Sequence, residues 1–144
     1  MNKNEVVAEF EKNIQSGYKI KKRIEKSLKS TSLSKQKFLT LVDLRLAGRS
    51  KLKEMAEDTG SSPQTLCIMY NNLEKESLIK REIDEKDRRN VYYSVTKEGD
   101  QLLKTAITEI KNAILAVLNE MDEKDVDEFG RALKTINKIV EENF

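Results

Sequence analysis

Residues 87–99 read Asp87-Arg88-Arg89-Asn90-Val91-Tyr92-Tyr93-Ser94-Val95-Thr96-Lys97-Glu98-Gly99, and this segment is the strongest indication of the fold. It begins as a charged turn, continues with the alternation of a β-strand, and ends with residues that suit the start of a helix. This order predicts a β-hairpin with a cationic tip. Two adjacent guanidinium groups with an aspartate beside them suit contact with a phosphate backbone or insertion into a minor groove.

Two short helices are predicted before the hairpin, around a tight turn at Thr59-Gly60-Ser61. Apolar residues recur at helical spacing in both helices: Leu52, Met55 and Ala56 in the first, and Leu66, Met69, Tyr70 and Leu73 in the second. Ser62 can cap the second helix, and Pro63, the only proline, suits its first turn. Two helices around a tight turn, followed by a hairpin, are typical of a winged helix-turn-helix.

The outer face of the second helix would meet the major groove of DNA. The candidate contact residues are Ser62, Gln64, Thr65, Ile68, Asn71, Asn72 and Lys75. Gln and Asn amides can bind adenine edges, and an outward isoleucine can contact thymine methyl groups. We therefore expect an AT-leaning operator. The alternative is that these side chains only solvate a surface helix.

The hairpin has a predicted inward face and a charged tip. The predicted inward residues are Ile83, Val91, Tyr93 and Val95, and the predicted outward ones are Glu82, Asp84, Tyr92 and Ser94. The candidate DNA-contacting residues at the tip are Lys86, Asp87, Arg88 and Arg89. Asp87 could orient Arg89 by a bidentate pair while the other two cations reach phosphates, or Arg89 could itself enter the minor groove. A solvated charged loop is the remaining alternative.

The whole chain is expected to be mainly α with this one small β-hairpin. The patterns predict helices at residues 3–29, 34–47, 51–58, 62–76, 97–119 and 123–142, and strands at 79–84 and 91–95. With five glycines, one proline and no low-complexity linker, we expect one domain over residues 1–144 with a winged core at 34–97. The flanking helical regions, 1–30 and 100–144, carry apolar stripes too long for a small core to cover. They are expected to form a homodimer, and packing within one chain is the alternative.

Composition narrows the class of protein. The chain has 36% charged and 38% apolar residues, no histidine and one cysteine. An internal disulfide is therefore impossible, and neither a metal site nor a cofactor nor catalysis is expected. No apolar run approaches the roughly 20 residues that span a bilayer, and the polar N-terminus lacks a signal-peptide core, so we expect a cytoplasmic protein. The net charge of +2 divides into +6 over the first 118 residues and −4 from Asn119 onward.

The motif set resembles the MarR-type transcriptional regulators. The resemblance rests on the helix-turn-helix, the terminal helices and the wing pattern D-x-R-x5-[LVI]-T-x2-G, filled by Asp87, Arg89, Val95, Thr96 and Gly99. It implies a homodimer with one winged helix per subunit, dimerisation by the terminal helices, and repression at a pseudo-palindromic operator until a ligand or oxidant intervenes. The chain has Ile68 where members often carry an arginine, which favours the AT-leaning operator. It has Ser77 where they often carry a glycine, which predicts a helix exit without a left-handed cap.

The sequence also raises the questions of how the protein is regulated and which other function the same surface could have. The resemblance implies an effector cleft between the dimerisation helices and the winged core, and Tyr18, Phe38 and Arg45 are candidate lining residues. A regulator without an effector is equally open. Cys67 is expected to be inert, since the chain has no second cysteine and the resembled redox sensors carry theirs nearer the N-terminal helix. The rival function is a protein-interaction module that uses the same winged surface.

Overall fold

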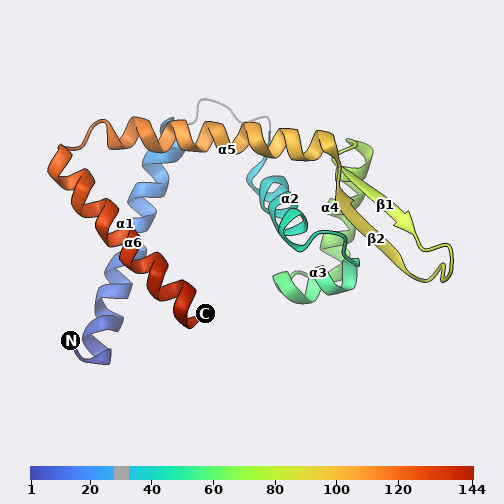
Figure 1. Cartoon of the computed structure of the whole chain (residues 1–144), viewed down its shortest axis with the longest axis horizontal. Coiled ribbons are helices and arrows are strands. Elements are labelled where there is room, and N and C mark those ends of the chain that lie inside the picture. Colours follow the sequence, from blue (N-terminus) through green and yellow to red (C-terminus); the bar gives the residue numbers. More distant parts are fainter. Residues whose placement is uncertain (28–32) are drawn as a thin grey trace. The chain divides into compact units, whose positions relative to one another are not determined.

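The computed structural model describes residues 1–27 and 33–144. In these residues it has six helices and one antiparallel two-stranded sheet (Figure 1). The elements are α1 (Lys3–Ser27), α2 (Lys35–Ala47), α3 (Leu52–Thr59), α4 (Pro63–Lys75), β1 (Ile79–Ile83), β2 (Val91–Val95), α5 (Lys97–Leu118) and α6 (Glu123–Asn143). The predicted fold class is confirmed, with boundaries that agree to about one residue. Residues 28 and 29 of the first predicted helix, and residue 30 of the first predicted dimerisation region, lie outside the described residues.

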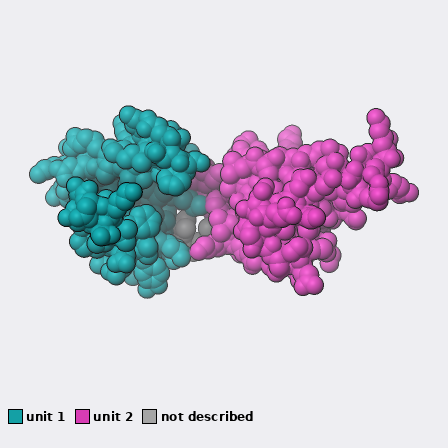
Figure 2. Space-filling view, turned by 90° about the horizontal axis from the view of Figure 1, so that it is seen from below, with its two compact units in different colours: residues 1–29, 110–144 teal, residues 30–109 magenta. Residues whose placement is uncertain are grey.

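The chain divides into two compact units, which Figure 2 colours separately. One unit, Ser30–Glu109, contains α2, α3, α4, the hairpin and the first part of α5. We call it the winged unit. The other unit, Met1–Lys29 with Ile110–Phe144, contains α1, the remainder of α5 and α6, and we call it the terminal unit.

In the described residues of the winged unit, the helices and the hairpin build an apolar core. The most deeply buried side chains are Tyr70, Leu41, Leu44, Leu73, Ile79 and Leu103. Capping residues determine where the helices around this core begin and end. The Ser62 hydroxyl oxygen accepts a hydrogen bond from the Thr65 amide at 3.1 Å and so caps α4. Gly60 ends α3 with a φ of +69°, a conformation that glycine adopts without strain.

The hairpin pairs Ile79 with Val95 and Ile83 with Val91. Tyr93 is buried, and Val91 and Val95 pack against the core, as predicted. The prediction for Ile83 is wrong, since its side chain is 45% exposed. Ile83 lies at the tip end of β1, where its partner Val91 reaches the edge of the core and is only half-buried, whereas Ile79 at the base of the hairpin is buried.

The exit from α4 also differs from the expectation. Ser77 has a φ of +60°, so it adopts the left-handed conformation that a glycine would adopt more easily. The Leu78 amide donates to the Leu73 carbonyl oxygen at 2.9 Å, and this bond closes the end of the helix. Helix α4 therefore ends in the left-handed conformation although a serine, and not a glycine, occupies the position. The bond between Leu78 and Leu73 requires the chain to reverse direction at Ser77.

The corner between β2 and α5 explains the end of the wing pattern. The Thr96 hydroxyl donates to the Ser77 carbonyl oxygen at 2.6 Å and accepts from the Gly99 amide at 3.0 Å. The Thr96 amide donates to the Leu78 carbonyl oxygen at 3.0 Å. A Cβ on Gly99 would lie 2.1 Å from that same oxygen. The pattern thus needs a threonine that caps α5 and a glycine against which the backbone after α4 can pack.

Tyr70 offers a stability test within the core. Its side chain is 1% exposed, and its hydroxyl has no hydrogen-bond partner among the described residues. Burial, followed by the neighbouring Asp43 and Tyr93, raises the pKa of Tyr70 from 10.0 to about 12. Below pH 10 both the folded and the unfolded tyrosine keep the proton. As the pH rises from 10 to 12 the unfolded tyrosine loses its proton first, so stability falls over that window.

We expect Tyr70→Phe to leave the free energy of unfolding at pH 7 unchanged or higher, since the variant buries no unpaired hydroxyl. At pH 11 the variant should gain about 1 kcal/mol relative to the wild type. Urea unfolding at both pH values measures this difference. A variant that is clearly less stable at pH 7 and shows the same alkaline loss would contradict the prediction.

Candidate nucleic-acid interface

Helix α4 presents the predicted contact residues on its outer side. Leu66, Tyr70 and Leu73 are buried, and Met69 is half-buried, so they hold α4 against the core. The predicted contact residues Ser62, Gln64, Thr65, Ile68, Asn71, Asn72 and Lys75 are all exposed. The helical spacing of Gln64, Ile68, Asn71 and Lys75 places these four on one stripe. We call them the α4 stripe.

Some of the exposed polar groups at α4 already form contacts within the protein. The Ser62 hydroxyl donates to the Thr65 hydroxyl oxygen at 2.7 Å, in addition to its capping bond. The Asn71 side-chain amide lies 3.8 Å from the Cys67 sulfur, which is exposed. The Gln64 amide and the methyl groups of Ile68, which is 65% exposed, are among the groups available to bases, together with the exposed side chains of Asn72 and Lys75.

At the tip of the hairpin, Asp87 holds Arg89 in a bidentate pair. The Arg89 Nε atom lies 3.0 Å from Asp87 Oδ1, and Arg89 Nη2 lies 3.1 Å from Oδ2. These bonds lower the pKa of Asp87 and raise the pKa of Arg89, so both groups keep their charges. The Arg89 side chain nevertheless remains 91% exposed. The tip therefore presents a guanidinium of fixed orientation to solvent, with Lys86 and Arg88 exposed beside it.

Two basic residues near the hairpin were not predicted. Arg49 donates from Nε to Glu82 Oε2 at 3.1 Å, and Lys51 donates from Nζ to Asn90 Oδ1 at 2.9 Å. Both lie between α2 and α3, far in sequence from the residues that they contact. A spacing rule operates within one element and so offers no signal for such pairs.

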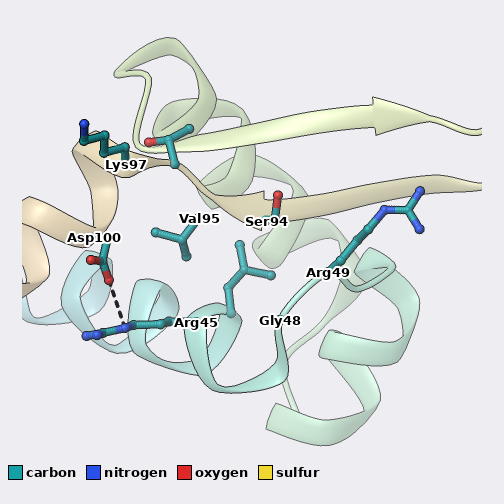
Figure 3. A pocket seen from close by; sticks show the side chains of 9 residues that line it. Arg45, Gly48, Arg49, Ser94, Val95, Lys97 and Asp100 are labelled. Atoms are coloured by element: carbon teal, nitrogen blue, oxygen red, sulfur yellow. Dashed lines mark ion pairs between the residues drawn. The ribbon is translucent and has the colours of Figure 1, made fainter.

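A hollow of about 310 Å³ lies between α2, β2 and the start of α5 (Figure 3). Arg45 lines it and pairs with Asp100, with Nε 3.0 Å from Oδ1. Lys104, followed by Arg45, lowers the pKa of Asp100. Of the other expected lining residues, Phe38 packs against the core and Tyr18 belongs to the terminal unit, where Lys22 lies over its ring. Only Arg45 of the three therefore lines this hollow.

Within residues 1–27 and 33–144, no three His, Cys, Asp or Glu side chains gather in a way that could hold a metal ion. No helix in the same ranges has the length and apolar character needed to cross a membrane.

Comparison with known proteins identifies relatives among transcriptional regulators. A family model described as transcriptional regulator SarA/Rot matches residues 19–107. The HTH-type regulator YwaE of Bacillus subtilis is 34% identical over 89 residues, which cover 61% of this chain and 52% of YwaE. The chain thus spans about half the length of that relative. The HTH-type transcriptional repressor MdtR of Bacillus subtilis is 27% identical over 108 residues, which cover 75% of this chain and 70% of MdtR.

Solved structures share the fold over nearly the whole chain. A MarR family protein from Bacillus stearothermophilus has a TM-score of 0.73 at 20% identity and covers 97% of this chain and 98% of its own. An S. aureus MepR variant bound to an oligodeoxyribonucleotide has a TM-score of 0.65 at 17% identity and covers 88% of this chain and 93% of its own. The relatives are regulators and not enzymes. The chain belongs to the SarA/Rot family of transcriptional regulators and has the MarR-type winged-helix fold.

Proposed function

We propose that the chain is a cytoplasmic homodimeric repressor that binds a pseudo-palindromic DNA operator. The observation that carries the proposal is that one unit presents both the α4 stripe and the guanidinium of Arg89, which Asp87 orients. Amide side chains on a helix suit base edges in a major groove, and an oriented arginine suits phosphates or a minor groove. Repression is supported by MdtR, a relative that is named a repressor.

The dimer is supported by apolar side chains that the single chain leaves uncovered. Along α6 the exposed fractions are 37% for Phe129, 44% for Leu133, 49% for Ile136 and 48% for Val140. In α1, Phe10 and Ile14 are 66% and 62% exposed. An apolar stripe of this length on a helix is typical of a surface that a second copy covers.

We also propose that a small-molecule effector relieves repression, and the hollow beside Arg45 supports this proposal. Its volume of about 310 Å³ is at the lower end of the range for small-molecule sites. Leu44 and Val95 offer apolar walls, and the Arg45 guanidinium offers an anchor for an anion if it exchanges Asp100 for the ligand. A small acid with an apolar body fits this lining best.

Selection from random duplexes tests the DNA-binding proposal. We expect enrichment of AT-leaning inverted half-sites whose centres lie one helical turn, or roughly 34–36 Å, apart. Affinity for the selected duplex should fall steeply as salt rises, because basic side chains displace counterions from phosphates. Failure to enrich any sequence, together with salt-insensitive binding to a protein, would instead favour the protein-interaction module.

The α4 stripe and the wing should differ in what their loss does to specificity. We expect Gln64→Ala or Asn71→Ala to reduce discrimination between the selected site and its base-pair variants, by about 1–3 kcal/mol at the contacted position. Arg89→Ala should weaken binding to all duplexes to a similar degree. Fluorescence anisotropy against the selected duplex and a set of single-site variants measures both effects. Unchanged discrimination in both amide variants would remove α4 from base recognition.

A further inference from the structure

The segment between α2 and α3, residues 48–51, is bonded directly to the hairpin, and we call it the strap. The Ser50 amide donates to the Tyr93 carbonyl oxygen at 3.0 Å, and the Tyr93 amide donates to the Ser50 carbonyl oxygen at 2.8 Å. Ser50 is 6% exposed, so this reciprocal pair is shielded from water. The strap therefore pairs with β2 in the manner of a short third strand.

Arg49 extends this link to both strands of the hairpin. Its guanidinium carbon lies 3.7 Å from the centre of the Tyr92 ring, and its Nε atom lies 3.1 Å from Glu82 Oε2. Glu82 on β1 and Tyr92 on β2 are cross-strand partners. One guanidinium thus contacts a facing pair of residues, and a cation over an aromatic ring is attracted by the negative face of the ring. Figure 3 shows the Arg49 side chain extending toward β2 and away from the Arg45–Asp100 pair.

Lys51 connects the strap to the tip. Its Nζ atom donates to Asn90 Oδ1 at 2.9 Å. The backbone amide of Asn90 in turn donates to the backbone carbonyl oxygen of Asp87 at 2.9 Å. Asp87 is the residue whose carboxylate holds Arg89. A continuous series of contacts therefore runs from the strap to the guanidinium at the tip.

The hairpin benefits from such a link because the core buries its base fully but its outer half only in part. Tyr93 and Ile79 are buried, but Ile83 is 45% exposed and its partner Val91 is only half-buried. An isolated two-stranded hairpin is at best marginally stable in water. Without the strap, its outer half would be held by its own ladder and by the partial burial of Val91, and ordering it on DNA would cost binding free energy.

We propose that Arg49 is a positioning residue for DNA binding. It fixes the hairpin against the helix-turn-helix, so that Arg89 reaches the duplex at a set place relative to α4, and it does so without touching DNA. This inference rests on the proposed function, because it assigns to the wing a contact with DNA.

Hydrogen exchange of the protein without DNA tests the link itself. We expect Arg49→Ala and Tyr92→Leu to speed exchange at amides of β1 and β2 near the tip, while Tyr92→Phe, which keeps the ring, stays close to the wild type. Lys80→Ala is the matched control. Lys80 binds the same carboxylate, with Nζ 2.9 Å from Glu82 Oε1, but it lies on the same strand and does not join the strap to the hairpin. Unchanged exchange in Arg49→Ala, or equal acceleration in Lys80→Ala, would overturn the proposal.

A double-mutant cycle with Arg89→Ala separates positioning from direct contact. For the selected duplex we expect Arg49→Ala to lower affinity about fivefold in the wild-type background. In the Arg89→Ala background the same change should cost less than about twofold, because the group that it positions is gone.

A direct phosphate contact by Arg49 would give the same loss in both backgrounds, together with a further fall of about one in the salt slope. That outcome would overturn the positioning role. If the wild type binds no duplex at all, the proposed function fails, while the exchange experiment still decides whether Arg49 holds the wing.

Discussion

Replacing Gly99 by alanine is expected to lower the free energy of unfolding of the winged unit by about 3 kcal/mol, which is the upper part of the range for overpacked sites. An added Cβ would lie 2.1 Å from the Leu78 carbonyl oxygen and 2.9 Å from Val95 Cγ1. The first neighbour is a backbone atom, and the same oxygen accepts the Thr96 amide at 3.0 Å. Relief of the clash therefore requires the backbone between α4 and β1 to move away from the start of α5.

Urea unfolding followed by circular dichroism measures this loss as a lower transition midpoint with little change in slope. Gly17→Ala is the matched control, since a Cβ at Gly17 meets nothing within 4 Å and Gly17 lies inside α1. Alanine there should be neutral, or stabilising by up to about 1 kcal/mol. If Gly99→Ala is as stable as Gly17→Ala, the account of the β2–α5 corner is wrong.

Placing a charge on the apolar stripe of α6 is expected to abolish tight operator binding. In Ile136→Asp, dimer formation would bury a carboxylate without a partner, so the protein should become monomeric. A monomer contacts one half-site and loses the gain from linked binding, which is about 100-fold or more. Sedimentation velocity measures the mass, and anisotropy with the selected duplex measures the affinity.

Thr135→Asp is the control for this variant because it introduces the same charge one residue earlier, off the stripe. The Thr135 hydroxyl donates only to the Arg131 carbonyl oxygen of the preceding turn, at 3.0 Å. We expect Thr135→Asp to remain dimeric and to bind with nearly the affinity of the wild type. Ile136→Asp that stays dimeric, with unchanged affinity, would show that α6 is not the dimer surface.

The elements of this fold were predictable where the signal is local. Ser62 and Pro63 mark the start of α4, and the inward spacing of Leu66, Tyr70 and Leu73 determines which residues of that helix face outward. Those signals depend only on residues a few positions apart, so they can be recognised in a single sequence. The pair between Asp87 and Arg89 is local for the same reason.

The parts that were missed depend on tertiary contacts. Alternation along β1 predicted the face of Ile83 but not the place where the core ends. The left-handed conformation of Ser77 is imposed by the bond between Leu78 and Leu73, against the preference of the residue type. Arg49 and Glu82 are 33 residues apart in sequence, so no periodic pattern connects them.

Binding of the wild-type protein to the selected duplex as a function of salt tests whether two chains together hold one DNA site. Sedimentation velocity should show two chains on one duplex, and anisotropy should show an affinity that falls by about 10³-fold or more between 50 and 200 mM salt. Such a result would support a dimer that binds with two recognition helices and two wings. A protein that remains a single chain and binds no duplex, even at the lowest salt, would contradict the account.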